Sequence, residues 1–318
     1  MRAVVFDTFG DPSVLRITDV ATPIPGEGEV VVAVAAAPVN PTDLMMRSGK
    51  QAALMTHLAP PYIAGMEFAG RVEAAGAGVA LKPGSPVIGV VNPRRPAGGA
   101  HAEFVAVPAA QVAILSDAVD LVGASMTPMN ALTALRALEL TGLVRGQSLI
   151  VTGGAGVFGG MLLRLARHAG IRTIAGGAEA DGALLRGLGA DFVMPRDPAD
   201  WSAFDKICPR GADALIDGAL IGDKVSRFVR EGGVAVALRK SNPITDARLS
   251  CVAVSVMDAF GRADWLAEIA GHVASGVLAP RIAEGGVFAC SDAVAAHRMA
   301  ESAHLRGRVI LTFDAGGA

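Results

Sequence analysis

A glycine-rich segment near the middle of the chain has the spacing of a phosphate-binding loop. Three of its glycines share the G-x-G-x-x-G pattern: Gly154, Gly156 and Gly159. In such a loop the first glycine permits a tight turn, the second lets the backbone approach a pyrophosphate, and the third lets a helix pack closely on a strand. Val157 and Phe158 lie between the last two glycines, so their backbone belongs to the same candidate site. We predict that these residues bind a dinucleotide; a glycine-rich turn without a ligand is the alternative.

The elements on either side of this loop are those of a nucleotide-binding unit. The apolar run 148–152 predicts a strand before the loop, and 171–175 predicts the next strand. Between them, apolar residues recur at helical spacing: Leu162, Leu165, Ala166 and Ala169. Gly170 follows at a position typical of a helix C-terminus. Strand, loop, helix and strand make a βαβ unit in which the helix N-terminus faces the anion.

Two side chains could distinguish NADP(H) from NAD(H). Glu179 lies about 20 residues after the loop, where a carboxylate accepts from the ribose 2′-hydroxyl in NAD-binding units. Arg196 follows the third predicted strand, and its guanidinium could pair with a 2′-phosphate. Each residue also has an ordinary interpretation, Glu179 as a helix N-terminal acid and Arg196 as a solvated loop residue.

The elements around this unit divide the chain into two kinds of structure. Before about residue 117, short strands separated by Pro and Gly predict an all-β, barrel-like domain: 3–7, 29–36, 67–75, 86–91 and 101–107. Afterwards strands alternate with helices, which predicts a doubly wound parallel sheet: 148–152, 171–175, 191–194, 214–217, 234–238 and 251–256. A loop at 284–286, a helix from Asp292 and a strand at 308–313 follow, and we expect them to rejoin the first domain.

The composition excludes several classes of function. Of the 318 residues, 52% are hydrophobic and 18% are charged, which excludes intrinsic disorder. With a net charge of −2, the chain has no excess of positive charge with which to bind nucleic acid or an anionic membrane surface. No apolar run reaches the ~18 residues of a membrane-spanning helix, and Asp7 interrupts the N-terminal segment before a secretory core forms. We therefore expect a cytoplasmic protein that binds neither nucleic acid nor membrane.

The chain as a whole resembles the medium-chain dehydrogenase/reductase superfamily, in its zinc-independent quinone oxidoreductase branch. Besides the glycine loop, the segments that carry the resemblance are VNPTD at 39–43, IAGMEFAG at 63–70, LKPG at 81–84, GGAHAEF at 98–104, ALTA at 131–134, LGAD at 188–191 and GRVIL at 307–311. The resemblance implies an α/β Rossmann domain with a doubly wound parallel sheet at 119–278. It also implies a GroES-like β-barrel domain at 1–118 and 279–318, with the active site in the cleft between the two domains.

The resemblance also indicates that the protein holds no zinc. Zinc-dependent relatives use a Cys, a His and a distal Cys at positions that match Asn40, Met66 and Met129. A neutral amide and two thioethers are poor zinc ligands. The structural zinc site with four cysteines is missing too, because the chain has only three cysteines: Cys208, Cys251 and Cys290. That number also excludes a disulfide framework, so we expect no metal and no disulfide scaffold.

Further site residues follow from the resemblance. Asn40 would hydrogen-bond the substrate carbonyl or the cofactor ribose, with a plain helix cap as the alternative. Thr133 would lie beside the nicotinamide and the phosphates, and its alternative is a hydrogen bond to its own helix backbone. Asp43 and Arg47 form an i, i+4 pair that we interpret as structural. Tyr62, the only tyrosine, is a candidate proton donor at the cleft edge, with a packing role as the alternative.

The chain departs from its relatives at positions that bear on substrate and cofactor. Met45 stands where related quinone reductases carry Tyr, and Lys50 and Gln51 stand where enoyl thioester reductases carry theirs. Asp181 replaces a lysine that binds the 2′-phosphate in many relatives. Arg196 offers a guanidinium in its place, so we expect NADP(H) rather than NAD(H).

These expectations combine into one function. An NAD(P)H-dependent, zinc-independent oxidoreductase would pass hydride to a small molecule, a quinone or an α,β-unsaturated carbonyl, held over the nicotinamide. The alternatives are an enoyl thioester reductase and a catalytically silent NAD(P)H-binding redox sensor. The last Rossmann strand carries alternating valines, Val252, Val254 and Val256, and would be an exposed sheet edge. Relatives cover this edge by pairing two subunits, so we expect a homodimer.

Overall fold

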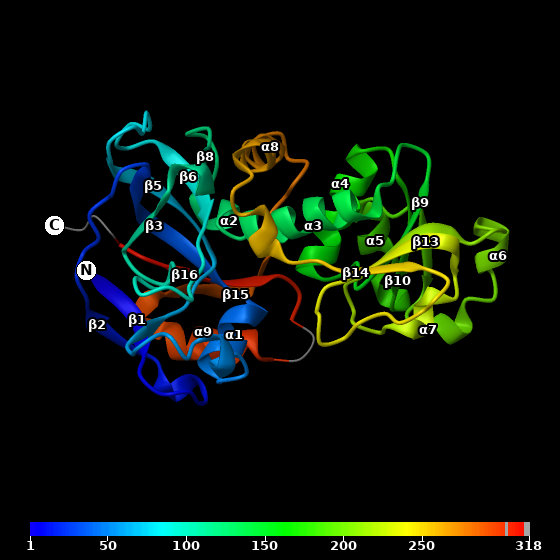
Figure 1. Ribbon diagram of the computed structural model, residues 1–318, viewed down its shortest axis with the longest axis horizontal. Helices are drawn as coiled ribbons and strands as arrows, with labels where there is room; N and C mark the ends of the chain where they lie inside the picture. The colour runs from blue at the N-terminus through cyan, green and yellow to red at the C-terminus, as the bar shows by residue number, and fades with distance from the viewer. Residues whose placement is uncertain (303–304, 315–318) are drawn as a thin grey trace. The chain divides into compact units, whose positions relative to one another are not determined.

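The computed structural model describes residues 1–302 and 305–314 of the chain. It has two compact units, one made of residues 1–129 with 260–318 and the other of residues 130–259 (Figure 1). The predicted C-terminal segment 279–318 includes residues 303–304 and 315–318, which lie outside the described part. Within the described ranges, no helix combines the length and the apolar character needed to cross a membrane.

The first unit is built on a mainly antiparallel sheet. Its strands follow the order β15-β16-β3-β5-β6-β8, and β7 also pairs with β3. The bounds are Glu29–Val39 for β3, Glu67–Ala75 for β5, Pro86–Val90 for β6, Phe104–Pro108 for β7, Val112–Ile114 for β8, Ile282–Ala289 for β15 and Arg308–Thr312 for β16. A smaller sheet has the order β2-β1-β4, with bounds Arg16–Asp19, Arg2–Phe6 and Tyr62–Ile63.

The central strand of the first unit is β3, and its valines suit that position. Val30, Val32 and Val34 are fully buried, and β-branched side chains pack well on a pleated surface. The far end of β3 pairs with β16, where Val309 is opposite Val39. Figure 1 shows the red C-terminal strand lying along the blue β3. The C-terminal segment thus joins the N-terminal sheet, as the resemblance implies.

Short helices accompany these sheets. The first unit contains α1 Pro41–Arg47, α2 Leu121–Ala124, α8 Ala263–Ala274 and α9 Ala293–Ala300. Helix α9 packs on β15 and β16, and α8 packs on β8. A longer helix, α3 Pro128–Thr141, begins in the first unit and continues into the second.

Two predictions for the first unit are wrong in detail. The loop expected at 284–286 belongs to β15, because Gly285, with φ +64, marks a register shift between Ile282 and Val287 and not the end of the strand. The strand expected at 101–107 begins only at Phe104. Strands β2, β4 and β8 were not predicted.

The second unit is a six-stranded parallel sheet in the order β11-β10-β9-β12-β13-β14. Its strands are β9 Ser148–Thr152, β10 Arg172–Gly177, β11 Phe192–Pro195, β12 Ala212–Asp217, β13 Val229–Ala237 and β14 Ser250–Ala253. Its helices are α4 Val157–His168, α5 Gly182–Leu188, α6 Phe204–Ile207 and α7 Asp223–Ser226. The strand order reverses between β9 and β12: β9 to β11 are added toward one edge of the sheet, and β12 to β14 toward the other. This arrangement confirms the doubly wound Rossmann fold.

The last strand of this sheet is shorter than predicted. Its partner β13 ends at Ala237, and the ladder closes when Val254 N–H donates to the Ala237 carbonyl oxygen at 2.9 Å. Val254 is therefore buried just beyond the strand, and Val256 lies in a 3₁₀ turn. Of the three alternating valines, only Val252 belongs to the edge strand β14.

Candidate functional site

The glycine loop begins with a turn made by Gly153. This residue follows β9 directly and has φ +66, a conformation that glycine adopts without the steric cost of a side chain. Gly154 is the next residue of the same turn, as predicted, because Gly156 N–H donates to the Gly153 carbonyl oxygen at 2.9 Å and so closes the turn around Gly154. Gly154 is buried, and a Cβ there would lie 2.9 Å from Leu185 of α5 and 3.1 Å from Leu163 of α4. Gly154 therefore lies in the turn and also permits close packing of both helices, whereas the positive φ belongs to Gly153.

Gly156 and Gly159 hold the start of α4 close to this turn. Gly156 is the exposed N-cap of α4 and has no side chain to cap the first turn. A Cβ on Gly159 would lie 2.3 Å from the carbonyl oxygen of Gly153, so only glycine permits this approach. Val157 and Phe158 are half-buried in the first turn. Because the first N–H groups of a helix have no partners within it, this exposed end fits a phosphate group.

The remainder of α4 anchors the loop to the sheet. Three of the four apolar residues expected on its inner face are buried: Leu162, Leu165 and Ala166. Ala169 is exposed, because the helix ends at His168 and Ala169 is already its C-cap. Gly170, with φ +73, then leads into β10.

Thr152 and Asp217 fix a second loop beside the glycine loop. They are the last residues of β9 and β12 and face each other in register. The Thr152 hydroxyl donates to Asp217 Oδ1, and Gly222 N–H donates to Oδ2 at 2.8 Å. Ala219 N–H donates to Thr152 Oγ1 at 3.0 Å. Asp217 was not among the predicted site residues, although an Asp that ends an apolar strand was a usable signal.

Glu179 and Arg196 lie beyond the same edge of the sheet as the glycine loop. Gly177, the last residue of β10, is opposite Pro195, the last residue of β11. Glu179 follows the first of these ends by two residues, and Arg196 follows the second directly; both are exposed. Since neighbouring strands are about 4.8 Å apart, the two residues predicted to read the cofactor 2′ position are brought to one place.

In the first unit, Asn40 belongs to a buried polar network with Glu67. Asn40 is the N-cap of α1, and its Nδ2 donates to Glu67 Oε1 at 3.0 Å. Glu67 Oε2 accepts from Met129 N–H at 2.8 Å. Burial raises the pKa of Glu67 to about 7, opposed by the positive charge of Arg308 and by these two hydrogen bonds. Glu67 was not among the predicted site residues.

One atom of Asn40 is left without a partner. Both Asn40 and Glu67 are completely buried, and within the described residues Asn40 Oδ1 makes no hydrogen bond. Buried polar atoms are nearly always hydrogen-bonded. Since the amide nitrogen is directed at Glu67, the oxygen is the atom of the Asn40 side chain that lacks a partner.

Asp43 fixes the backbone around Asn40. Its Oδ2 accepts from Asn40 N–H at 2.7 Å, and its Oδ1 accepts from Gly65 N–H at 3.0 Å. Burial raises the pKa of the Asp43 carboxyl, while His101 and the two backbone N–H groups oppose this shift. Asp43 thus ties the start of α1 to the segment before β5.

Arg47 does not pair with Asp43, so the predicted i, i+4 pair is wrong. Both Asp43 oxygens are occupied by backbone N–H groups. Arg47 instead donates to the Gly10 carbonyl oxygen at 2.8 Å and forms an ion pair with Glu301. Both residues are structural, as expected, but with other partners.

Two buried histidines adjoin this network. His101 Nε2 lies 3.1 Å from the Pro38 carbonyl oxygen, and its ring meets that of His297 edge-on at 6.1 Å. Both side chains are completely buried. Burial lowers the pKa of His297 to about 3, and His101 and Arg47 add to this effect. This pair was not predicted, because the two residues are far apart in the chain.

Tyr62 and Thr133 are the remaining predicted site residues. Tyr62 lies in β4, and its ring stacks on Phe9 at 5.6 Å and contacts Phe6 at 5.4 Å. Tyr62 is therefore part of an aromatic cluster, which fits the alternative that it has a packing role and is not a proton donor. Thr133 lies in the second turn of α3 and is half-buried.

The side chains at the positions of the zinc ligands do not fit zinc. The amide nitrogen of Asn40 donates to Glu67, and Met129 contributes its backbone N–H to the same carboxyl group. The side chains of Met66 and Met129 are thioethers, which favour softer metals. Among residues 1–302 and 305–314, no three His, Cys, Asp or Glu side chains are grouped so as to hold a metal ion.

Comparisons with known proteins agree with this architecture. Residues 26–117 match the alcohol dehydrogenase GroES-like domain, and residues 188–311 match the zinc-binding dehydrogenase family. A quinone oxidoreductase from Lama guanicoe is 30% identical over 253 residues, covering 77% of this chain and 74% of that protein. The chloroplastic NADPH-dependent alkenal/one oxidoreductase of Arabidopsis thaliana is 29% identical over 319 residues, covering 98% and 79%. A mycobacterial protein solved in complex with NADPH superposes with a TM-score of 0.80 at 27% identity, covering 98% of this chain and 100% of that chain.

Proposed function

The chain belongs to the quinone oxidoreductase-like branch of the medium-chain dehydrogenase/reductase superfamily, and from this premise we propose that it reduces quinones or α,β-unsaturated carbonyls with NAD(P)H. Relatives named quinone oxidoreductase and alkenal/one oxidoreductase support this substrate class. The observation that carries the proposal is the exposed start of α4, where Gly156 leaves the first turn uncapped and Gly159 keeps the helix close to Gly153. Such a helix end receives the pyrophosphate of a dinucleotide.

The nicotinamide cofactor, when bound, supplies the hydride. In this proposal Gly154, Gly156 and Gly159 shape the loop, and the backbone of Val157 and Phe158 faces the pyrophosphate. Conjugation in a quinone or an enone delocalises the incoming negative charge, so the acceptor needs no metal. The final proton can come from water, which suits a protein whose predicted donor, Tyr62, is stacked on Phe9.

We assign Asn40 to a ligand hydroxyl, such as that of the cofactor ribose. The buried Oδ1 has no partner in the described chain and can only accept a hydrogen bond. A hydroxyl supplies the missing proton, whereas a substrate carbonyl has none to give. Of the two roles expected for Asn40, the hydrogen bonding therefore favours the ribose.

NADP(H) is the proposed cofactor in preference to NAD(H). Arg196 lies at the strand end where a guanidinium can pair with a 2′-phosphate, and Glu179 is the competing residue on the neighbouring strand. The Arabidopsis relative is named NADPH-dependent. Arg196→Gln should weaken NADPH binding about tenfold or more and leave NADH binding nearly unchanged, because a hydrogen-bonded ion pair contributes ~1.5–3 kcal/mol. Fluorescence titration of both cofactors measures this, with Glu179→Gln as the comparison; an equal loss for the two cofactors contradicts the assignment.

The proposed function is tested by the acceptors that the protein uses. NADPH oxidation is followed with 9,10-phenanthrenequinone, with an alkenal and with crotonyl-CoA. Turnover of the quinone or the alkenal is the expected result. Turnover of crotonyl-CoA alone would make the protein an enoyl thioester reductase. Tight NADPH binding without oxidation by any acceptor would make it a silent redox sensor, and either outcome contradicts the proposal.

We also propose that two chains pair through β14. This strand ends the sheet order, and its residues Ser250 and Cys251 are exposed. An unpaired strand edge is a template for another strand, so a second copy can extend the sheet. The cytoplasmic location and the domain bounds of 119–278, and of 1–118 with 279–318, stay predictions.

A further inference from the structure

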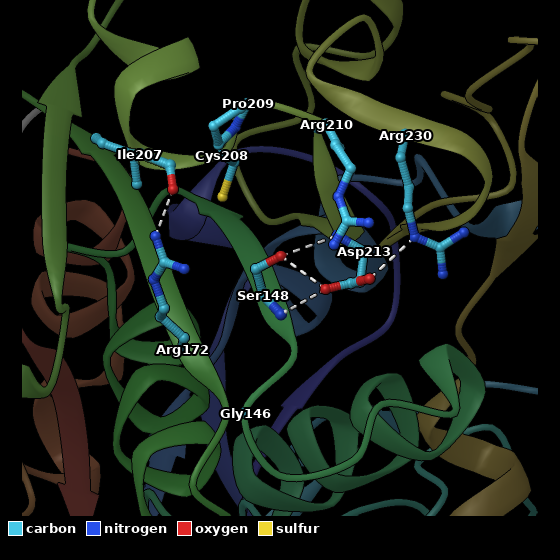
Figure 2. A pocket seen from close by; sticks show the side chains of 10 residues that line it. Gly146, Ser148, Arg172, Ile207, Cys208, Pro209, Arg210, Asp213 and Arg230 are labelled. Atoms are coloured by element: carbon cyan, nitrogen blue, oxygen red, sulfur yellow. Dashed lines mark hydrogen bonds and ion pairs between the residues drawn. The ribbon is translucent and has the colours of Figure 1, made fainter.

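A second concave site lies at the edge of the parallel sheet opposite the glycine loop. A cavity of about 480 Å³ is lined by residues at the amino ends of neighbouring strands (Figure 2). Ser148 and Arg172 begin β9 and β10, and Asp213 and Arg230 are the second residues of β12 and β13. Strand β9 has five residues, so the cavity and the glycine loop are separated by about 16 Å of sheet.

The charged residues that line this cavity are mostly positive. Figure 2 shows Arg172, Arg210 and Arg230 arranged around Ser148 and Asp213. Three guanidinium groups and one carboxylate give the lining a net charge of +2, in a chain whose total net charge is −2. Positive charge is thus concentrated at this edge of the sheet.

The carboxylate of Asp213 is already occupied by the protein. Its Oδ2 accepts from the backbone N–H and from the hydroxyl of Ser148, both at 2.8 Å. Its Oδ1 accepts from Arg230 Nε at 2.9 Å. Burial alone would raise the pKa of Asp213, but these hydrogen bonds and the Arg230 charge lower it overall. Asp213 therefore stays ionised and orients Arg230, and it does not compete for the other guanidinium groups.

The three arginines retain unused donors. Arg172 donates through Nη2 to the Ile207 carbonyl oxygen and lies 5.0 Å from the Phe192 ring, which holds its guanidinium in place. Arg230 uses Nε for Asp213 and Nη1 for the Glu231 carbonyl oxygen at 3.2 Å, and this leaves Nη2. Within the described chain, Arg210 makes no hydrogen bond or ion pair. Two positioned guanidinium groups and one free group thus border the same space.

We propose that this cavity binds a small phosphorylated molecule with at least two negative charges. The planar guanidinium group presents paired donors that match the oxygens of a phosphate group. Phosphate oxygens only accept hydrogen bonds, so they match a lining whose free groups are donors. Two negative charges on the ligand would balance the net charge of +2 on the lining. The cavity volume is within the ~300–1,000 Å³ of small-molecule sites, which leaves room for a phosphate ester or a nucleotide as well as for inorganic pyrophosphate.

The test is calorimetric titration of the whole protein in excess NADPH, which occupies the glycine loop proposed to bind the cofactor pyrophosphate; the titrants are pyrophosphate and, separately, ATP, at constant ionic strength. Arg210→Gln is the test variant, because Arg210 is exposed and has no partner whose loss would disturb the fold. Arg186→Gln is the matched control, because it removes the same charge from an exposed residue of α5 that is not part of the cavity. Equal unfolding midpoints for wild type and both variants establish that each is folded.

Wild-type protein should bind pyrophosphate saturably, and Arg210→Gln should weaken this binding about tenfold or more while Arg186→Gln leaves it unchanged. Tighter binding of ATP than of pyrophosphate would identify a nucleotide as the ligand, and tighter binding of pyrophosphate would identify the phosphate groups alone. No saturable binding by the wild type would overturn the proposal. Equal losses in the two variants would also overturn it, because the effect would then come from net charge and not from this cavity. Neither result depends on whether the protein reduces a quinone or an enone.

Discussion

The buried carboxyl of Glu67 makes the stability of the protein depend on pH. Burial raises its pKa from 4.5 to about 7, so the folded state holds this proton more tightly than the unfolded state does. Stability from this group is therefore fully present below pH 4.5 and is lost as the pH rises to about 7. At ~1.4 kcal/mol per pKa unit, the loss across this window is about 3 kcal/mol.

Glu67→Gln removes this titration. We expect the free energy of unfolding of the variant to fall less than that of the wild type between pH 4.5 and 7, by about 3 kcal/mol. Denaturant unfolding at a series of pH values measures the difference. Glu73→Gln, which changes an exposed carboxyl on the same strand β5, is the control and should follow the wild type. If the free energy of unfolding depends on pH in the same way for the wild type and for Glu67→Gln, the Glu67 carboxyl does not titrate in this range.

Asn40→Leu tests the proposed contact with a ligand hydroxyl. The substitution keeps the approximate volume but removes the free Oδ1, so NADPH should bind about tenfold more weakly while kcat changes by only a few-fold. Cofactor titration and steady-state kinetics separate the two quantities. Ser48→Ala, at the other end of α1, is the control. A fall in kcat of about 100-fold with unchanged NADPH affinity would instead place Asn40 at the substrate carbonyl.

The close approach of α4 to the glycine loop should make the protein sensitive to a larger residue at Gly159. Gly159→Ala places a Cβ 2.3 Å from the Gly153 carbonyl oxygen, so the helix must move away from the loop. Overpacking of this kind costs ~1–3 kcal/mol, and the displaced helix end should also bind NADPH at least tenfold more weakly. Thermal unfolding and cofactor titration measure the two effects.

Gly187→Ala is the matched control for this substitution. Gly187 lies in α5, and a Cβ there would meet no atom within 4 Å. Alanine is a better helix former than glycine, so this variant should be more stable by ~0.5–1 kcal/mol and should keep its affinity for NADPH. Equal losses of stability and of affinity in both variants would contradict the role of close packing at Gly159.

Elements with a strong local pattern could be predicted from the sequence. The bounds of β5 and β9 agree with the prediction, because each is a run of suitable residues that ends at a turn signal. β15 was missed because Gly285 and Gly286 resemble a loop, whereas the strand continues through an irregularity that β16 stabilises. Pairing with a distant strand is a tertiary effect that local propensity does not contain.

The glycines of the candidate site could be predicted from the sequence, but its buried polar residues could not. The spacing of Gly154, Gly156 and Gly159 located the turn that leads into α4, because the backbone there approaches itself too closely for a side chain at Gly159. Spacing could not reveal that the positive φ of this turn belongs to Gly153. Nor could it reveal the buried Glu67, whose partners Asn40 and Met129 are distant in sequence. Burial of a polar group is decided by the fold, so residues of this kind appear only in the structure.

At the scale of the whole molecule, the free edge of β14 predicts the oligomeric state. Light scattering should give twice the mass of one chain, and Cys251→Lys should weaken the association about tenfold or more, because it places a charge on an exposed position of that edge. Ile17→Lys is the control, since it adds the same charge to the exposed edge strand β2. A wild-type protein that stays monomeric at all concentrations would rule out pairing through β14.

As a quinone or enone reductase, the protein must transfer a hydride from its cofactor to a conjugated acceptor. Hydride transfer can be followed with NADPH that carries deuterium at both C4 positions of the nicotinamide, with an alkenal as acceptor and mass spectrometry of the product. We expect a saturated product with one deuterium at the β-carbon. We also expect that Gly159→Ala, which disturbs the cofactor loop, forms this product much more slowly at the same cofactor concentration. A product without deuterium, or no product with either an alkenal or a quinone, would contradict this function.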